Sequence, residues 1–206
     1  MKLIFVALRS EWKYFFEAHK KQFMLLYGND REMVAHYPDF DLLVYQTGIG
    51  PDLPLIYLDN ILSQFNITEI YNIGFCGIHH SSLEIGSIVI PKTVSLYQSD
   101  HTSYSTDRNS YISNKTEGVE IPQLMTFPFV VTMDKVSLPE ETIAIDMEAF
   151  YLFQKLSEKG KKLMVIKIVS DYLTAESLGD LIKTHLSLLR KKQHEIMNII
   201  AGIHDK

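Results

Sequence analysis

The stretch "TIAIDMEAFYLFQKLSEKGKKLMVIKIVSD", residues 142–171, contains the pattern that decides the fold. Residues 142–145 have the alternation of a half-buried strand, and residues 162–169 form a nearly continuous apolar run, as in strands covered on both faces. Between them, residues 148–159 begin with an apolar helical run and end before Gly160, a typical helix terminator. Strand, helix and strand in succession indicate an α/β fold.

The rest of the chain repeats this alternation. Strands are predicted at residues 2–7, 41–46, 69–74, 87–91 and 129–132, and helices at residues 10–25, 52–65 and 177–200. Several of the strands are almost entirely apolar, which favours a sheet that is covered on both faces. We therefore expect a single domain over residues 1–206, a three-layer α/β/α sandwich around a central, mostly parallel but mixed sheet.

Residues 95–128 interrupt the alternation. They are rich in Ser, Tyr, Asn and Thr, and no period is sustained along them. A stretch of this length inside a compact domain is either a functional loop or an inserted segment. We expect a loop here, and we expect it to be more mobile than the sheet.

Composition limits the partners and the compartment. Of the 206 residues 46% are hydrophobic, and 25 acids against 20 lysines and arginines give a net charge of -5. This balance, without a dense Lys/Arg stripe, argues against a nucleic-acid partner. The single cysteine, Cys76, excludes an internal disulfide and suits a reducing compartment. The apolar run at residues 3–8 is too short for a signal peptide or a membrane span, so we expect a cytoplasmic protein without a membrane partner.

Acidic residues stand where several predicted strands end. Glu11 follows the first strand, Asp146 and Glu148 follow the strand at residues 142–145, and Asp171 follows the last strand. The glycine-containing segments "TGIGP" and "GFCGIHH" follow two other strands and would let a ligand approach the backbone closely. Ligands of α/β sheets bind at the carboxyl ends of the strands, so these residues are the candidates for a site.

Each of these features also has a simpler explanation. Strand ends are solvated, and acids at the start of a helix are favoured by a few tenths to about 1 kcal/mol, so Glu148 could serve solvation alone. "TGIG" is not followed by the Lys-Ser/Thr of a phosphate loop. His79 and His80 are adjacent and would face opposite sides of a strand, so we assign them to a loop surface rather than to a metal. No metal and no cofactor are expected.

Taken together and in order, these segments resemble the nucleoside phosphorylase and nucleosidase superfamily. Residues 45–100 resemble its central stretch, with a Gly-Ile-Gly helix start followed by a glycine loop at "NIGFCGIHH". "AIDMEAF" is similar to its Met-Glu ribose-binding segment, and "VSD" at 169–171 is similar to its Ser-Asp purine-binding segment. The resemblance covers residues 1–94 and 129–200 and is closest to the methylthioadenosine/S-adenosylhomocysteine nucleosidases.

The resemblance implies a role for each acid. Glu148 would bind the ribose hydroxyls, and Met147 would pack against the sugar. Asp171, oriented by Ser170, would give a proton to N7 of the purine as the glycosidic bond breaks. A purine leaves poorly as an anion, and proton transfer of this kind is typically worth about 10² to 10⁴-fold in rate. Glu11 stands where these nucleosidases place the glutamate that activates water.

Hydrolysis and phosphorolysis remain alternatives. Phosphorylases of the superfamily supply arginines to the phosphate, and the segment "GFCGIHHSS" contains none. A carboxylate at Glu11 would repel phosphate and suit a water nucleophile, which favours a hydrolase. Arg9 keeps the phosphorylase alternative open.

Several residues depart from the family pattern. Phe75 and Cys76 stand beside Gly77 in the predicted pocket wall, where the nucleosidases have smaller residues at the first two positions. Val136, next to Ser137, stands where they have an aromatic that stacks on the base. These changes leave the nucleoside open, with a modified purine such as aminodeoxyfutalosine among the candidates.

Two further classes remain, namely a catalytically weak relative that senses a nucleoside and an unrelated α/β binding module. The combination of Glu11, Glu148 and Asp171 argues against both, because a pure binder needs no acid at N7.

The resemblance also implies a homodimer. We expect the helix at residues 52–65 to contribute to its interface, since its apolar residues (Leu55, Leu58, Ile56 and Ile61) lie on more than one side. In addition, Tyr97, Tyr104 and Tyr111 in the stretch 95–128 could stack on a base, so we expect this loop to border the substrate cleft of its own or of the partner subunit.

Overall fold

The computed structural model describes residues 1–29, 31–78, 83–97, 103–106, 114–129, 138, 142–173 and 178–203, with residues 178–182 as backbone only. The strands are β1 (Lys2–Val6), β2 (Met24–Gly28), β3 (Met33–Tyr37), β4 (Leu42–Gln46), β5 (Glu69–Ile78), β6 (Ile88–Leu96), β7 (Ser103–Ser105), β8 (Val119–Thr126), β9 (Thr142–Asp146) and β10 (Met164–Asp171). The helices are α1 (Lys13–His19), the 3-10 helix η1 (Pro38–Phe40), α2 (Leu58–Gln64), α4 (Ala149–Ser157) and α5 (Leu178–Ala201).

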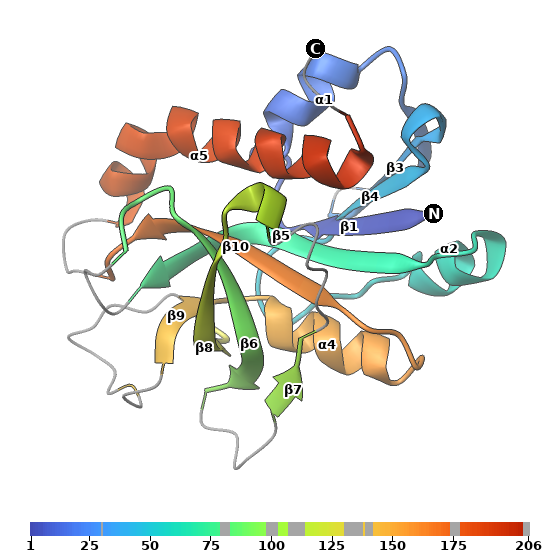
Figure 1. The fold of residues 1–206 in the computed structure, drawn as a ribbon. Coiled ribbons are helices and arrows are strands. Elements are labelled where there is room, and N and C mark those ends of the chain that lie inside the picture. The colour runs from blue at the N-terminus through green and yellow to red at the C-terminus, as the bar shows by residue number, and fades with distance from the viewer. Residues whose placement is uncertain are drawn as a thin grey trace.

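One mixed sheet contains an open part and a closed ring (Figure 1). In the open part, β5 is followed by β1, β4, β3 and β2. In the ring, β5, β10, β6, β8 and β9 are joined in this order, and β9 returns to β5. The 10-residue strand β5 belongs to both parts, because its residues 69–72 pair with β1 and its last two, Gly77 and Ile78, pair with β9.

The structure therefore confirms the predicted three-layer sandwich only in part. Helices α1 and α5 pack on one side of the sheet and α4 and α2 on the other, as expected for a layered α/β protein. The ring is not a flat middle layer, because β6, β8 and β9 curl back towards β5. The sheet is mixed as predicted, but among the described strands parallel and antiparallel pairings are equally numerous rather than mostly parallel.

The prediction of an irregular loop over residues 95–128 is wrong at both ends. Strand β6 continues through Leu96, and β8 occupies residues 119–126 as a full member of the ring. Pro122 within β8 argues against a strand when the sequence is read alone, because proline cannot donate to a neighbouring strand. The structure accommodates it, since the pairing of β8 with β9 begins only at Gln123.

Other predicted elements are shifted in extent. The helices predicted at residues 10–25 and 52–65 are shorter, at 13–19 and 58–64, and the antiparallel pair β2–β3 at the sheet edge was not predicted. Residues 130–132 of the strand predicted at 129–132 lie outside the described residues, as does Ser177 at the expected start of the last helix.

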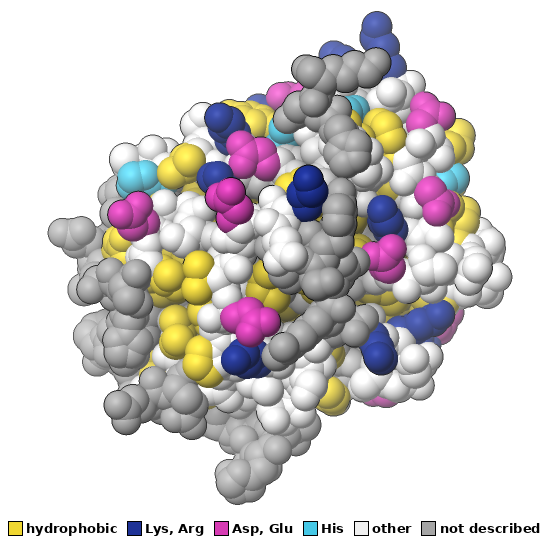
Figure 2. All heavy atoms as spheres, in the orientation of Figure 1, with side chains coloured by type: hydrophobic (Ala, Val, Ile, Leu, Met, Phe, Trp, Pro, Cys, Tyr) yellow, Lys and Arg dark blue, Asp and Glu magenta, His cyan; other side chains and the backbone are white. Residues whose placement is uncertain are grey.

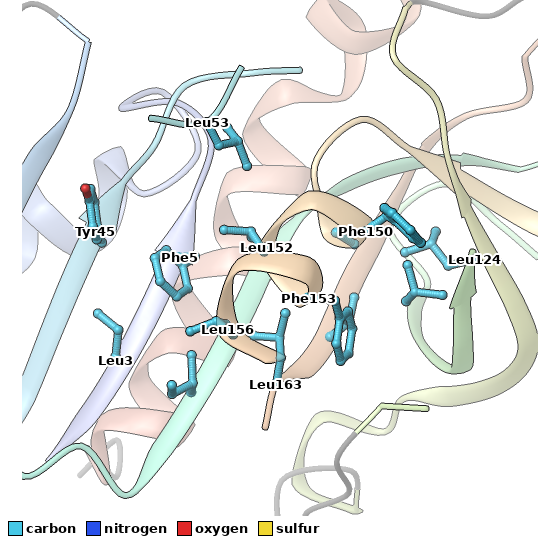
Figure 3. Close-up of a cluster of buried hydrophobic side chains, with 14 of the residues drawn as sticks. Leu3, Phe5, Tyr45, Leu53, Leu124, Phe150, Leu152, Phe153, Leu156 and Leu163 are labelled. Carbon is cyan, nitrogen blue, oxygen red and sulfur yellow. The ribbon is translucent and has the colours of Figure 1, made fainter. Parts of the chain in front are cut away.

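Alternate residues of the strands enter two separate cores, as the pleat of a strand requires. Leu3 and Phe5 of β1 belong to the core that contains Leu152 and Leu156 of α4 (Figure 3). Ile4 and Val6 belong to the other core, which is closed by α1 and α5. This burial on both faces explains why β1 and β4 read as nearly continuous apolar runs.

The surface is mixed in charge. Figure 2 shows acidic and basic side chains interspersed over the face that it displays, without a large patch of one sign. Within the described part of the chain, no helix is both long enough and apolar enough to cross a membrane.

Candidate active site

A cavity of about 310 Å³ lies where β1, β5, β9 and β10 end at their carboxyl edges. This volume lies at the lower end of the range typical of small-molecule sites. The predicted site residues that the structure describes all line it, namely Glu11, Phe75, Cys76, Gly77, Met147, Glu148, Ser170 and Asp171. Val136 and Ser137 lie outside the described residues.

Glu11 is folded back onto the end of β1. Its Oε2 accepts hydrogen bonds from the backbone amides of Ala7 at 2.9 Å and Leu8 at 3.2 Å. The side chain is buried, and this burial raises the pKa of Glu11 to about 6, although Lys167 and the two amides oppose the rise. A carboxyl group with such a pKa is poised to take up a proton near neutral pH.

Asp171, at the end of β10, is held by two hydrogen bonds. Its Oδ1 accepts the backbone amide of Leu173 at 3.0 Å, and its Oδ2 lies 2.8 Å from the Ser170 hydroxyl, which also lies 3.1 Å from the Cys76 carbonyl. Gly77 makes room for this arrangement, because a methyl group there would lie 2.9 Å from Oδ1 of Asp171 and would overlap the side chain of Leu173. The carboxyl group of Asp171 is thus fixed in direction at the cavity wall.

Asp146, the last residue of β9, and Glu148, two residues further on, have different surroundings. Asp146 is engaged in structure: its Oδ2 accepts the amide of Ala149 at the start of α4 at 3.0 Å, and its Oδ1 accepts the Thr126 hydroxyl at 2.6 Å. Burial raises the pKa of Glu148 to about 8, with Asp146 and Glu11 adding to the rise and Lys167 opposing it. Glu148 lines the cavity at a helix start, yet it is only 8% exposed, so solvation alone does not explain it.

The rest of the cavity wall is largely apolar and was not foreseen from the sequence. Leu8, Ile49, Phe129, Leu173 and Leu186 contribute to it. Sequence reasoning missed them because Leu8, Ile49, Phe129 and Leu173 follow strands or stand in loops, where no periodicity marks a residue as facing a ligand. Leu186 lies in α5, and the helical period does not show that it faces a cavity rather than the core. Phe129 lies in the segment for which a strand was predicted, and it supplies an aromatic ring at the site.

Phe129 belongs to a small aromatic cluster. The ring of Tyr97 stacks on Phe127 at a centroid distance of 4.2 Å and meets Phe129 edge-on at 6.4 Å. Tyr104 instead stacks on Phe153 of α4, and Tyr111 lies outside the described residues. Among the described residues of the stretch 95–128, none lines the cavity itself. The stretch reaches the cleft only indirectly, where Tyr97 contacts Phe129 of the cavity wall.

Cationic side chains do not line the described cavity wall. Arg9, which left a phosphate site open, is exposed, and its guanidinium lies over the Phe16 ring, 4.9 Å from the centroid. The lining includes four acids, Glu11, Asp146, Glu148 and Asp171. No group of three or more side chains suited to hold a metal ion occurs in the described part of the chain, and His79 and His80 lie outside it.

Comparison with known proteins gives a match in fold. No protein-family model and no curated protein matches the sequence. The 5′-methylthioadenosine/S-adenosylhomocysteine nucleosidase from Neisseria meningitidis, solved with methylthio-immucillin-A, is 16% identical, with a TM-score of 0.78 over 97% of each chain.

Two further nucleosidases of the same name agree with this match. The Helicobacter pylori protein, solved with butyl-thio-DADMe-immucillin-A, is 14% identical, with a TM-score of 0.81 over 98% of this chain and 97% of that chain. The Streptococcus pneumoniae protein, solved with 8-aminoadenine, is 14% identical, with a TM-score of 0.78 over 98% of each chain. At the level of fold, the resemblance seen in the sequence motifs is confirmed.

Proposed function

We propose that this protein is a purine nucleosidase that hydrolyses the N-glycosidic bond of an adenine-type nucleoside. Methylthioadenosine and S-adenosylhomocysteine are the first candidates, and a related purine nucleoside such as aminodeoxyfutalosine is the next. The observation that carries the proposal is the joint placement of Glu11, Glu148 and Asp171 in one cavity whose described wall contains no cation. The fold shared with nucleosidases supports it.

The reaction follows from the chemistry of these three groups. Asp171 gives its proton to N7 of the purine while the bond between C1′ and N9 breaks, so that the base leaves as a neutral molecule. Glu148 forms hydrogen bonds with the ribose hydroxyls, with Met147 beside the sugar, and the ionised carboxylates of the cavity wall stabilise the cationic character that develops at C1′. Water adds to C1′, and Glu11 takes up the proton that the water loses.

Water rather than phosphate is the proposed nucleophile. A phosphate ion would enter a site with four acids in its described wall and no Lys or Arg to bind it, which is unfavourable in a partly buried cavity. Arg9 is held away on the surface over Phe16.

The first test is a nucleoside screen. We expect the purified protein to release free base from one or more of methylthioadenosine, adenosylhomocysteine, inosine and aminodeoxyfutalosine, at the same rate with and without added phosphate. The free base is measured by chromatography together with the reducing sugar that hydrolysis leaves. A rate that appears only when phosphate is added, with a sugar phosphate as product, would establish a phosphorylase instead. A folded protein that binds a nucleoside and releases no base would be a sensor.

We also propose that the protein is a cytoplasmic homodimer of one catalytic domain per chain. Ile49 at the cavity wall and Ile56 before α2 are 49% and 55% exposed, so an apolar contact is available beside the site. Of the four apolar residues of the segment 52–65 that were expected at this interface, only Ile56 is exposed. Leu55, Leu58 and Ile61 are buried within the chain and cannot contribute to it. Light scattering at tens of micromolar should give twice the mass of the 23.7 kDa chain, and a monomer would contradict the proposal.

A further inference from the structure

Lys167 is a fully buried charged residue in the middle of β10. Its relative exposure is 0%, and the strand around it is apolar, with Ile166 and Ile168 on either side. An ammonium group taken out of water is strongly destabilising unless it is paired with opposite charge. The charge therefore needs partners, and these partners are residues of the candidate active site.

Two carboxyl groups lie within 4 Å of the Lys167 ammonium, and a third, that of Glu11, lies beyond them beside the opening at Gly74. Its Nζ lies 2.8 Å from Oδ2 of Asp146 and 3.9 Å from Oε2 of Glu148. Glu11 approaches the same place from the end of β1, because a methyl group built on Gly74 would lie 3.3 Å from Nζ and 3.9 Å from Oε1 of Glu11.

Gly74 explains how these groups come together. It stands directly opposite Lys167 in the pairing of β5 with β10. The space that a side chain at residue 74 would fill is instead shared by the lysine ammonium and the Glu11 carboxyl group. The aligned strands thus leave one small opening, and the charged groups meet in it.

We propose that Lys167 is a positioning residue for the hydrolysis: anchored by Asp146, its ammonium group holds the carboxyl groups of Glu148 and Glu11 in place on one side of the cavity. Lys167 does not itself line the cavity. It acts through the two acids, which do. This inference rests on the proposed function for its catalytic consequence but not for the charge arrangement itself.

The electrostatics are consistent with this role. Burial lowers the pKa of Lys167, but Asp146, Glu148 and Glu11 together outweigh it and raise the pKa above its ordinary value, so the lysine stays charged. Burial raises the pKa values of Glu11 and Glu148, and the positive charge of Lys167 lowers both and so opposes this rise. Burial raises the pKa of the Cys76 thiol, and the charge of Lys167 opposes this rise only in part, so the thiol stays protonated.

The test replaces the charge and follows the carboxyl groups directly. In Lys167→Met, the pKa values of Glu11 and Glu148 should rise by about 1 to 3 units, as is typical when an opposite charge within a few ångströms is lost. They are measured by ¹³C NMR titration of labelled glutamate carboxyls, assigned through Glu11→Gln and Glu148→Gln. Lys167→Arg keeps the charge and should leave both titrations near their wild-type positions. Lys191→Met, at an exposed lysine of α5, is the matched control and should change neither.

The pH profile of kcat/KM gives the second readout. Its acidic limb should move to higher pH in Lys167→Met by the same amount as the Glu11 titration, because Glu11 must lose its proton before it can accept one from water. A purely structural lysine would lower activity at every pH and leave the limb in place. If folded Lys167→Met titrates like the wild type, the proposal is overturned. If the titrations move but no variant and no wild type releases base, the charge arrangement stands and the proposed function fails.

A double variant protects the test against misfolding. Lys167→Met alone leaves Asp146 buried without its cation, which can be strongly destabilising, whereas Asp146→Asn with Lys167→Met removes both charges of the pair. Among the influences that lower the pKa of Glu11, Lys167 is the largest, ahead of the amides of Leu8 and Ala7. The double variant should therefore still raise the pKa of Glu11, and an unmoved Glu11 titration in it would also overturn the proposal.

Discussion

Asp171→Asn is expected to lower kcat by about 10² to 10⁴-fold while leaving nucleoside binding within about tenfold, because the proton is used chiefly in the transition state. Asparagine has the size of aspartate and keeps one oxygen to accept the Leu173 amide, so the local structure should persist. It has no proton that it can give to N7. Stopped-time assays of base release measure kcat, and calorimetric titration with an uncleaved nucleoside analogue measures binding.

The control for this variant is Asp39→Asn in the 3-10 helix η1, which is exposed and precedes β4, at the end of that strand away from the cavity. It should retain wild-type turnover. An Asp171→Asn protein that releases purine at the wild-type rate would show that the general acid has been assigned to the wrong residue, even if the protein is a nucleosidase.

Glu11→Gln is expected to abolish turnover in phosphate-free buffer, and added phosphate should not restore it. Glutamine can still accept the amides of Ala7 and Leu8 through its oxygen, so the turn after β1 should be preserved. It cannot take up a proton from water. Glu17→Gln on α1, whose carboxylate is exposed and lies 3.6 Å from Lys13, should leave turnover unchanged.

The wild-type pH dependence gives an independent check on Glu11. Burial raises the pKa of this carboxyl group from 4.5 to about 6. The carboxylate is the form that accepts a proton, so the contribution of Glu11 to kcat/KM should be lost as the pH drops through about 6. A phosphorylase would behave differently: its Glu11→Gln variant would keep phosphate-dependent turnover, and Arg9→Ala would raise its KM for phosphate.

The pattern of apolar residues along the sequence correctly predicted those helices and strands that bury one continuous face, or both faces, in the core. The strand–helix–strand succession of residues 142–171 corresponds to β9, α4 and β10, and the long helix near the end of the chain corresponds to α5. Such elements can be predicted because the period of their apolar residues is set by their own geometry. Strands β2, β3 and β8 were missed for different reasons: part of the apolar run of β2 was assigned to the helix predicted at residues 10–25, β3 is interrupted by His36, and β8 contains Pro122.

The sequence by itself predicted the candidate site residues of this protein: acids at the ends of predicted strands, in an order that resembles one superfamily, pointed to Glu11, Glu148 and Asp171, and the structure places all three in one cavity. The tertiary structure decided which other residues join them. Closure of β5, β10, β6, β8 and β9 into a ring depends on strand register between segments far apart in the chain, which no local period records. For the same reason, the sequence alone shows Lys167 only as a charged residue within an otherwise apolar core strand. Only the pairing that sets it opposite Gly74 shows that it lies beside carboxyl groups of the cavity.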